Sequence, residues 1–188
     1  QVYEPVEVDL SSPPSGAPRI VHLGSLETTS NRVGLTAYLD RAHAEVCERL
    51  ARAGLEAPLY VVGDVSRARP DLAEKLSAAC ATCTGFVHDL RTVLRPFDLQ
   101  IIPYEYSTGM RTKVALAFNH AQVVVSTRAA VAGMPEMEHG ANCVLLPSVA
   151  EFPAAIEELV RSPEKRRDLG VNARATYERC YRLEAQLD

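Results

Sequence analysis

The chain lacks an excess of basic residues and any long apolar run, and each absence excludes a class of protein. Its 188 residues carry 20 Lys and Arg against 24 Asp and Glu, which gives a formal net charge of -4. Nonspecific nucleic-acid binding needs a basic surface, so this balance argues against a nucleic-acid partner. No stretch is apolar and long enough to predict a transmembrane segment, and no signal peptide is visible.

The cysteine pattern fits neither a disulfide framework nor a metal site. The five cysteines are Cys47, Cys80, Cys83, Cys143 and Cys180. An odd, scattered set in a chain of this size predicts reduced thiols and a cytoplasmic protein. Cys80 and Cys83 form a C-x-x-C pair, but a metal site would need a second pair. Because the pair ends a predicted helix instead of opening one, we interpret it as two small buried residues.

The N-terminal segment differs in composition from the remainder of the chain. Residues 1–18 are rich in Pro, Ser and acidic residues, which is typical of a linker or extended arm. The chain opens on Gln1 instead of Met, so we expect a piece of a longer protein whose missing part lies upstream. Residues 19–188 have the length and apolar content of one domain with its own core. The sequence therefore predicts an arm at 1–18 and an α/β domain with C-terminal helices at 19–188.

Predicted strands and helices alternate along this domain. Short apolar strands are expected at 19–23, 59–62, 84–87, 99–103, 123–125 and 143–146. Apolar residues recur at helical spacing from Leu35 to Ala53, from Pro70, and from Phe152, while residues 27–31 are expected to be a polar loop. This alternation predicts a Rossmann-like α/β fold with a doubly wound, mostly parallel sheet.

The segment 99–127 is the most informative part of the sequence. An apolar strand runs into a polar loop that contains Gly109, and this loop opens a helix whose first turn holds Arg111 and Lys113. The first turn of a helix offers free N–H groups and the positive end of the helix dipole to an anion. Arg adds a bidentate fork and Lys a point charge, so this segment predicts a phosphate site.

Two further turns are expected at the same edge of the sheet. Gly24-Ser25 ends the first strand and Gly63-Asp64 ends the second. In doubly wound sheets ligands bind where strands end and helices begin, so these turns are candidates to approach the same phosphate-bearing ligand.

Six short motifs, in this order, resemble the C-terminal half of the retaining glycosyltransferases of the GT-B fold, group 1 (family 4). They are HLGSL at 22–26, VVG at 61–63, G-x-V-x-D-L at 85–90, STGMRTKVALAFNHAQVVVST at 107–127, G-x-N-x-x-L-L at 140–146 and P-x-x-R-x-x-L-x-x-x-A-R at 163–174. The resemblance covers nearly the whole chain. It implies a single GT-B C-terminal domain that binds a nucleotide-diphosphate sugar donor for transfer to an acceptor.

The resemblance also implies a set of donor-binding residues, namely Gly24, Ser25, Thr108, Gly109, Arg111 and Lys113. The two cations would face the diphosphate, and the turn after the first strand would approach the phosphates. An N-terminal domain, absent here, would supply the acceptor site. No cofactor or metal is expected, because the cations and the helix dipole would stabilise the leaving diphosphate.

The sequence departs from the family pattern at one informative position. Leu116 stands where the family usually carries a glutamate that holds the ribose hydroxyls, and Asn31-Arg32 stands where Lys-Gly is common. A site built for a hydrogen bond loses discrimination when that contact is removed. The departure leaves open a degenerate, non-catalytic scaffold or interaction domain, which would bind no nucleotide. A nucleotide-sugar epimerase half is a third alternative, but the histidines that it would need are scattered in sequence.

Overall fold

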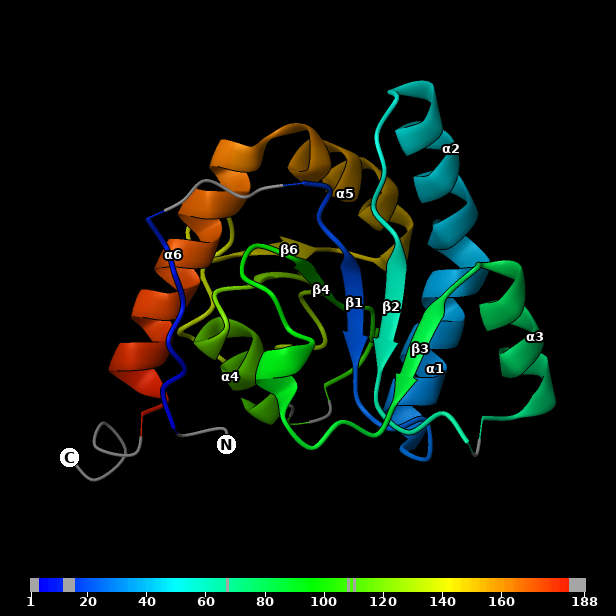
Figure 1. Cartoon of the computed structure of the whole chain (residues 1–188), viewed down its shortest axis with the longest axis horizontal. Coiled ribbons are helices and arrows are strands. Elements are labelled where there is room, and N and C mark those ends of the chain that lie inside the picture. The colour runs from blue at the N-terminus through cyan, green and yellow to red at the C-terminus, as the bar shows by residue number, and fades with distance from the viewer. Residues whose placement is uncertain (1–3, 12–15, 67, 108, 110, 183–188) are drawn as a thin grey trace.

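The chain forms one central sheet with helices on both faces (Figure 1). The computed structural model describes residues 4–11, 16–66, 68–107, 109 and 111–182, with Arg111 described as backbone only. The six strands lie in the order β3-β2-β1-β4-β5-β6, and neighbouring strands are parallel. This is a doubly wound order that reverses between β1 and β4. The predicted fold class is confirmed.

The elements follow the predicted alternation. The strands are β1 (Ile20–Leu23), β2 (Leu59–Val62), β3 (Thr82–Gly85), β4 (Leu99–Ile102), β5 (Val123–Thr127) and β6 (Cys143–Leu146). The α-helices are α1 (Thr29–Tyr38), α2 (Ala44–Arg52), α3 (Pro70–Ala78), α4 (Arg111–Asn119), α5 (Phe152–Arg161) and α6 (Pro163–Cys180). A π-helical turn, η1 (Leu39–His43), joins α1 to α2, and η2 (Leu90–Thr92) and η3 (Val149–Glu151) are 3-10 turns.

Two sequence-based boundaries are wrong. The first helix already begins at Thr29, inside the segment that we expected to be a polar loop. The strand expected at 84–87 lies two residues earlier, because Gly85 adopts a φ of +70° and ends it. Polar residues at the start of a helix can be mistaken for a loop in the sequence, because Ser, Thr and Asn also favour turns.

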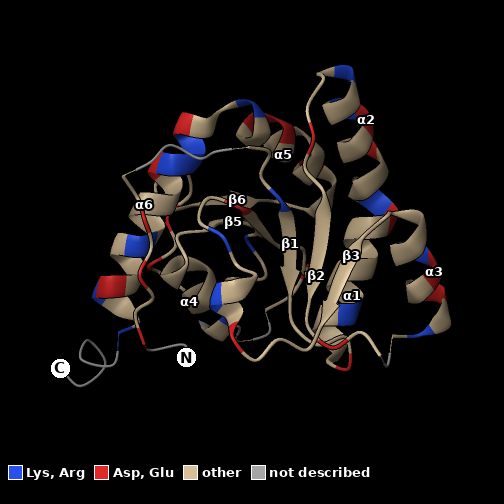
Figure 2. Cartoon of the chain, viewed as in Figure 1, with Lys and Arg blue, Asp and Glu red and all other residues tan. Residues whose placement is uncertain are grey.

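The sheet divides the core into two layers. One layer packs α1, α2, α3 and α5 against one face, and the other packs α4 and α6 against the opposite face. Along β5, Val123 and Val125 enter the first layer and Val124 the second, as the alternation of side chains along a strand requires. A parallel sheet covered on both faces favours strands that are mostly apolar, and β1, β4 and β5 are buried at every residue. Charged residues gather instead on the helices and loops around the sheet (Figure 2).

A buried ion pair joins the beginnings of the two central strands. Arg19 donates from its backbone N to Asp98 Oδ1 at 2.8 Å and from Nε to Asp98 Oδ2 at 2.7 Å. Asp98 is 2% exposed, so this carboxylate depends on its partners in place of water. The pair aligns the start of β1 with the start of β4, the two strands that flank the reversal of strand order.

The N-terminal segment lies along α4 and α6 (Figure 1). Val6 donates its backbone N–H to Asn119 Oδ1 at 3.0 Å, and Asn119 Nδ2 donates to the Glu4 carbonyl at 2.8 Å. Residues 5–10 form no helix or strand, in keeping with an extended arm. The division into an arm at 1–18 and a domain at 19–188 stays a prediction.

The interpretation of the C-x-x-C pair as buried is wrong. Cys80 follows α3 and Cys83 lies on β3, as expected, but both side chains are exposed. The reason is that β3 is an edge strand of the sheet, with β2 as its one neighbour.

Candidate functional site

A pocket of about 400 Å³ opens where the strand order reverses, between the end of β1 and the first turns of α1 and α4. It is lined by Leu23, Gly24, Thr28, Ser30, Asn31, Gly109, Thr112, Lys113 and Leu116. Doubly wound folds bind ligands at this point of the sheet. The structure therefore brings three of the predicted residues together: Gly24, Gly109 and Lys113.

Gly24, which lines the pocket, is in close contact with Gly63 at the end of the neighbouring strand. Gly24 has a φ of +129° and Gly63 a φ of +142°, which side chains rarely permit. A Cβ on Gly63 would lie 2.6 Å from the carbonyl carbon of Gly24, and one on Gly24 would lie 2.4 Å from Asn31 Nδ2. Glycine is required at both turns, because backbone and the Asn31 amide occupy the space that a side chain would need.

Lys113 brings a buried amine to the pocket. Its Nζ donates to Asn31 Oδ1 at 2.6 Å and to Tyr104 Oη at 2.8 Å, and the residue is 9% exposed. Both acceptors are neutral, and no carboxylate among the described residues pairs with this amine. Burial lowers the pKa of Lys113 to about 7. A buried cation without a counter-charge is costly, so an anion in the pocket would be a favourable partner.

Tyr104 and Asn31 form the frame that holds this amine. Tyr104 donates its hydroxyl to Asn31 Oδ1 at 2.8 Å, and Asn31 Nδ2 donates to the Ser25 carbonyl at 2.7 Å. His22 Nε2 lies 3.5 Å from the Tyr104 hydroxyl. Burial raises the pKa of the Tyr104 hydroxyl. The pKa of His22 is lowered well below its usual value, chiefly by burial and also by the positive charge of Lys113. Both rings therefore stay neutral around the lysine.

Sequence reasoning missed this frame. Asn31 stood out only as a departure from the family pattern. Tyr104 lies in the segment 99–127 that predicts the phosphate site, but it was not among the predicted binding residues. A usable signal lies in Gly34, where a Cβ would come within 1.8 Å of Tyr104 Cδ1. A glycine inside a helical pattern indicates that another group approaches the helix closely.

The other predicted donor-binding residues are not all placed in the pocket. Ser25 does not line it, and its hydroxyl accepts a hydrogen bond from the Glu27 backbone N–H at 3.2 Å. Arg111 is the first residue of α4, and its side chain lies outside what the structure describes. Thr108 falls outside the described residues. Within those residues, no group of three His, Cys, Asp or Glu side chains could hold a metal ion.

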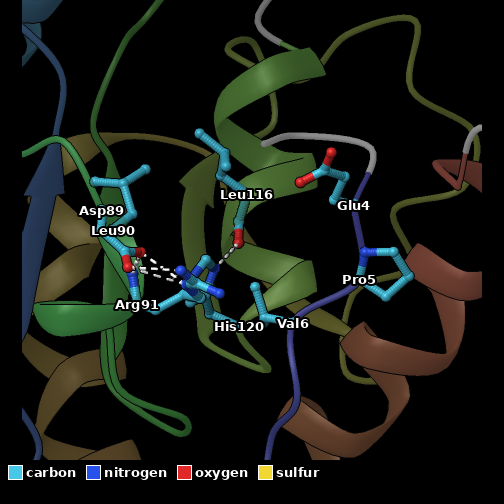
Figure 3. Close-up of a pocket in the computed structure, with 8 residues that line it drawn as sticks. All are labelled: Glu4, Pro5, Val6, Asp89, Leu90, Arg91, Leu116 and His120. Atoms are coloured by element: carbon cyan, nitrogen blue, oxygen red, sulfur yellow. Dashed lines mark hydrogen bonds and ion pairs between the residues drawn. The ribbon is translucent and has the colours of Figure 1, made fainter.

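Leu116 forms a wall between this pocket and a second, smaller one. The second pocket, of about 110 Å³, is lined by Glu4, Pro5, Val6, Asp89, Leu90, Arg91, Leu116 and His120 (Figure 3). Its carboxylate at Asp89 is already engaged, accepting from Arg91 Nε at 2.8 Å and from Arg91 Nη2 at 2.7 Å. Leu116 packs into the apolar cluster that contains Leu23 and Leu90.

Comparison with known structures identifies the fold. The C-terminal domain of the group 1 glycosyl transferase LpcC from Francisella tularensis superposes with a TM-score of 0.67 at 15% identity, over 95% of this chain and 99% of that one. TarM from S. aureus, crystallised with UDP, gives 0.69 at 17% identity over 96% of this chain and 36% of that one. Anabaena HepE with UDP gives 0.62 at 18% identity, over 91% and 47%. The chain thus spans under half of the latter two proteins. A comparison with curated proteins gives no significant match.

The family model for group 1 glycosyl transferases matches residues 17–162. The chain belongs to this family, and its structure is that of a GT-B C-terminal domain. The resemblance inferred from the six sequence motifs is therefore confirmed. In the described part of the chain, no helix has the length and hydropathy needed to cross a membrane.

Proposed function

We propose that this chain binds a nucleotide-diphosphate sugar and supplies the donor half of a glycosyltransferase. The observation that carries the proposal is the buried Lys113 amine, held by neutral partners at the edge of a pocket where the strand order reverses. The structures of HepE with UDP and with UDP-glucose, and of TarM with UDP, support this choice of ligand.

In this proposal the diphosphate lies over Gly24 and the first turn of α4. Lys113 protonates and donates to a phosphate oxygen, while the helix dipole adds a second favourable term. Negative charge grows on the diphosphate as its bond to the sugar breaks, so fixed positive groups stabilise the transition state. Ser25, Thr108, Gly109 and Arg111 are proposed as further donor contacts, and no metal is needed.

The remainder of the reaction is assigned to a part of the protein that this chain lacks. We propose that a missing N-terminal domain holds the acceptor and completes the active site, so this chain alone should transfer no sugar. The free thiols fit a reducing compartment, and we propose the cytoplasm as the site of action.

Calorimetric titration of the chain with UDP, GDP and ADP, with and without Mg²⁺, tests the proposal. We expect one of the three to bind without metal. Lys113→Met, which keeps the length of the side chain and removes the charge, should weaken that binding by roughly 10- to 100-fold, the usual worth of a charge-assisted hydrogen bond.

Lys165→Met is the matched control. Lys165 pairs with Glu158 on the outer surface and should leave the affinity unchanged. If a folded sample binds none of the three nucleotides at millimolar concentration, the donor assignment is wrong and a non-catalytic scaffold remains.

A further inference from the structure

The pocket has two sides of different chemistry around Lys113. On the α1 side it presents the hydroxyl-bearing Thr28 and Ser30 together with Asn31, and on the other side it presents the apolar Leu23 and Leu116. Leu116 lies three residues after Lys113, so both side chains share one face of α4. A ligand whose phosphate meets Lys113 therefore meets an apolar wall within one helical turn.

This apolar wall is backed by a cluster of the hydrophobic core. Leu23 belongs to a buried cluster with Val21, Val62 and Leu94, against which Val87, Leu90 and Leu116 pack. In a nucleotide-diphosphate sugar, the base of the nucleoside has the larger apolar faces, whereas the transferred sugar carries hydroxyls on most of its carbons. The chemistry of the two sides therefore places the nucleoside over Leu116 and the sugar toward Thr28 and Ser30.

No carboxylate lines this pocket among the described residues. A carboxylate can accept two hydrogen bonds from a vicinal diol, which makes it the usual means of recognising a ribose. Asp89 and Glu4 line the second pocket, on the other side of Leu116 (Figure 3). Asp89 is moreover already bound by Arg91 through both of its oxygens.

We infer that Leu116 makes this site indifferent to the ribose hydroxyls, so that 2'-deoxyribonucleoside diphosphates bind at least as tightly as their ribonucleoside counterparts. The inference rests on the proposed function and narrows its substrate class. A site that hydrogen-bonds a hydroxyl rejects the analogue that lacks it by about 10⁴- to 10⁵-fold. An apolar wall gains nothing from the hydroxyl and leaves it without a partner.

Paired titrations test this directly: UDP against dUDP, GDP against dGDP and ADP against dADP, with the 188-residue chain. For the base that binds, we expect the deoxy form to bind equally or up to about tenfold more tightly. A preference of more than about tenfold for the ribo form would overturn the inference while leaving the proposed function intact. Absence of binding by every nucleotide would instead remove the proposed function and the inference with it.

Variants at the wall locate the effect. Leu116→Glu should shift the ratio of affinities by about tenfold or more toward the ribonucleotide, because it places a diol acceptor on the wall. Leu116→Met is the matched apolar control and should keep the wild-type ratio. Asp89→Asn should also keep it, and a change there would overturn the inference by assigning the ribose to Asp89. The comparison of ribo and deoxy forms on the wild-type chain decides the question even if Leu116→Glu does not fold.

Discussion

At the scale of single residues, the state of charge of Lys113 decides how the pocket behaves. Its amine is held by Asn31 and Tyr104, and its pKa is lowered to about 7 because the group is buried. Titratable neighbours are His22 and Tyr104, which remain neutral above pH 7 since the pKa of the first is lowered and that of the second raised.

Affinity for a nucleotide sugar should therefore fall as the pH rises above about 7. The ammonium is the form that pairs with phosphate, and each pH unit above the pKa of the empty site reduces that form by about tenfold. A nucleotide sugar suits the measurement because its phosphates are both esterified and do not titrate in this range. Titrations at pH 6.5 to 8.5 check the slope. The Lys113→Arg variant stays charged over this range, so its affinity should depend much less on pH. A wild-type affinity that does not change with pH would contradict the lowered pKa of Lys113.

The chain offers a matched pair of buried tyrosines that tests the frame around this lysine. Tyr104 and Tyr38 are both 0% exposed, but only Tyr104 has hydrogen-bond partners for its hydroxyl among the described residues. Tyr104→Phe should lower the free energy of unfolding by about 1–3 kcal/mol, because it removes one buried hydrogen bond from Asn31 Oδ1 and one from Lys113 Nζ. Tyr38→Phe should be neutral or stabilising. Urea denaturation measures both, and equal losses would mean that the hydroxyl network contributes nothing.

At the scale of elements, helix α1 and the segment after β4 pack closely because α1 carries a glycine, Gly34, at the point of contact. A Cβ at Gly34 would lie 1.8 Å from the Tyr104 ring. Gly34→Ala would ordinarily stabilise a helix by about 1 kcal/mol. Here overpacking should dominate and destabilise the chain by about 1–3 kcal/mol. Val33→Ala, at an exposed position on the same helix, is the control and should change stability by less than about 0.5 kcal/mol. A stabilised Gly34→Ala variant would show that Tyr104 moves freely away from α1.

An element could be predicted from the sequence where its own residues show a clear hydrophobic pattern. The buried strands β1, β4 and β5 are mostly apolar, so the pattern alone located them. The edge strand β3 carries Thr, Cys and Gly, and its expected position was wrong by two residues. The start of α1 was missed because Thr29 and Ser30 suit a loop as well as a helix.

The candidate site was predictable where it depends on one segment and not where it depends on several. Lys113 and Gly24 follow from a strand-loop-helix unit and a strand-ending turn, and the structure places both in one pocket. Asn31 and Tyr104 matter because of contacts between segments 73 residues apart, which no local pattern encodes. Ser25 does not line the pocket, and its hydroxyl instead accepts a local hydrogen bond from the Glu27 backbone N–H two residues further along the chain.

At the scale of the whole molecule, Asn119 ties three parts of the chain together. It bonds to the arm at Val6 and Glu4, and Arg174 on α6 donates to its Oδ1 at 2.7 Å. Asn119→Ala should release the arm and destabilise the chain by about 2–4 kcal/mol, because three partners each lose a partly buried hydrogen bond. A glutamate-specific protease should then cut faster after Glu4 and Glu7. Asn172→Ala, which removes one exposed bond to Ala141, is the control. Unchanged cleavage of the Asn119 variant would show that the arm is held elsewhere.

The order of the strands in the sheet also determines when each strand can pair during synthesis. β1 lies at the centre of the sheet between β2 and β4, and the ion pair at its base joins residues 79 positions apart. During synthesis β1, β2 and β3 emerge together, but the second neighbour of β1 follows only after all three. Non-local pairings of this kind slow folding and leave apolar strand edges exposed meanwhile. A growing chain that has reached β3 therefore presents one unpaired edge of the mostly apolar strand β1, and this is the stage at which a chaperone would matter most.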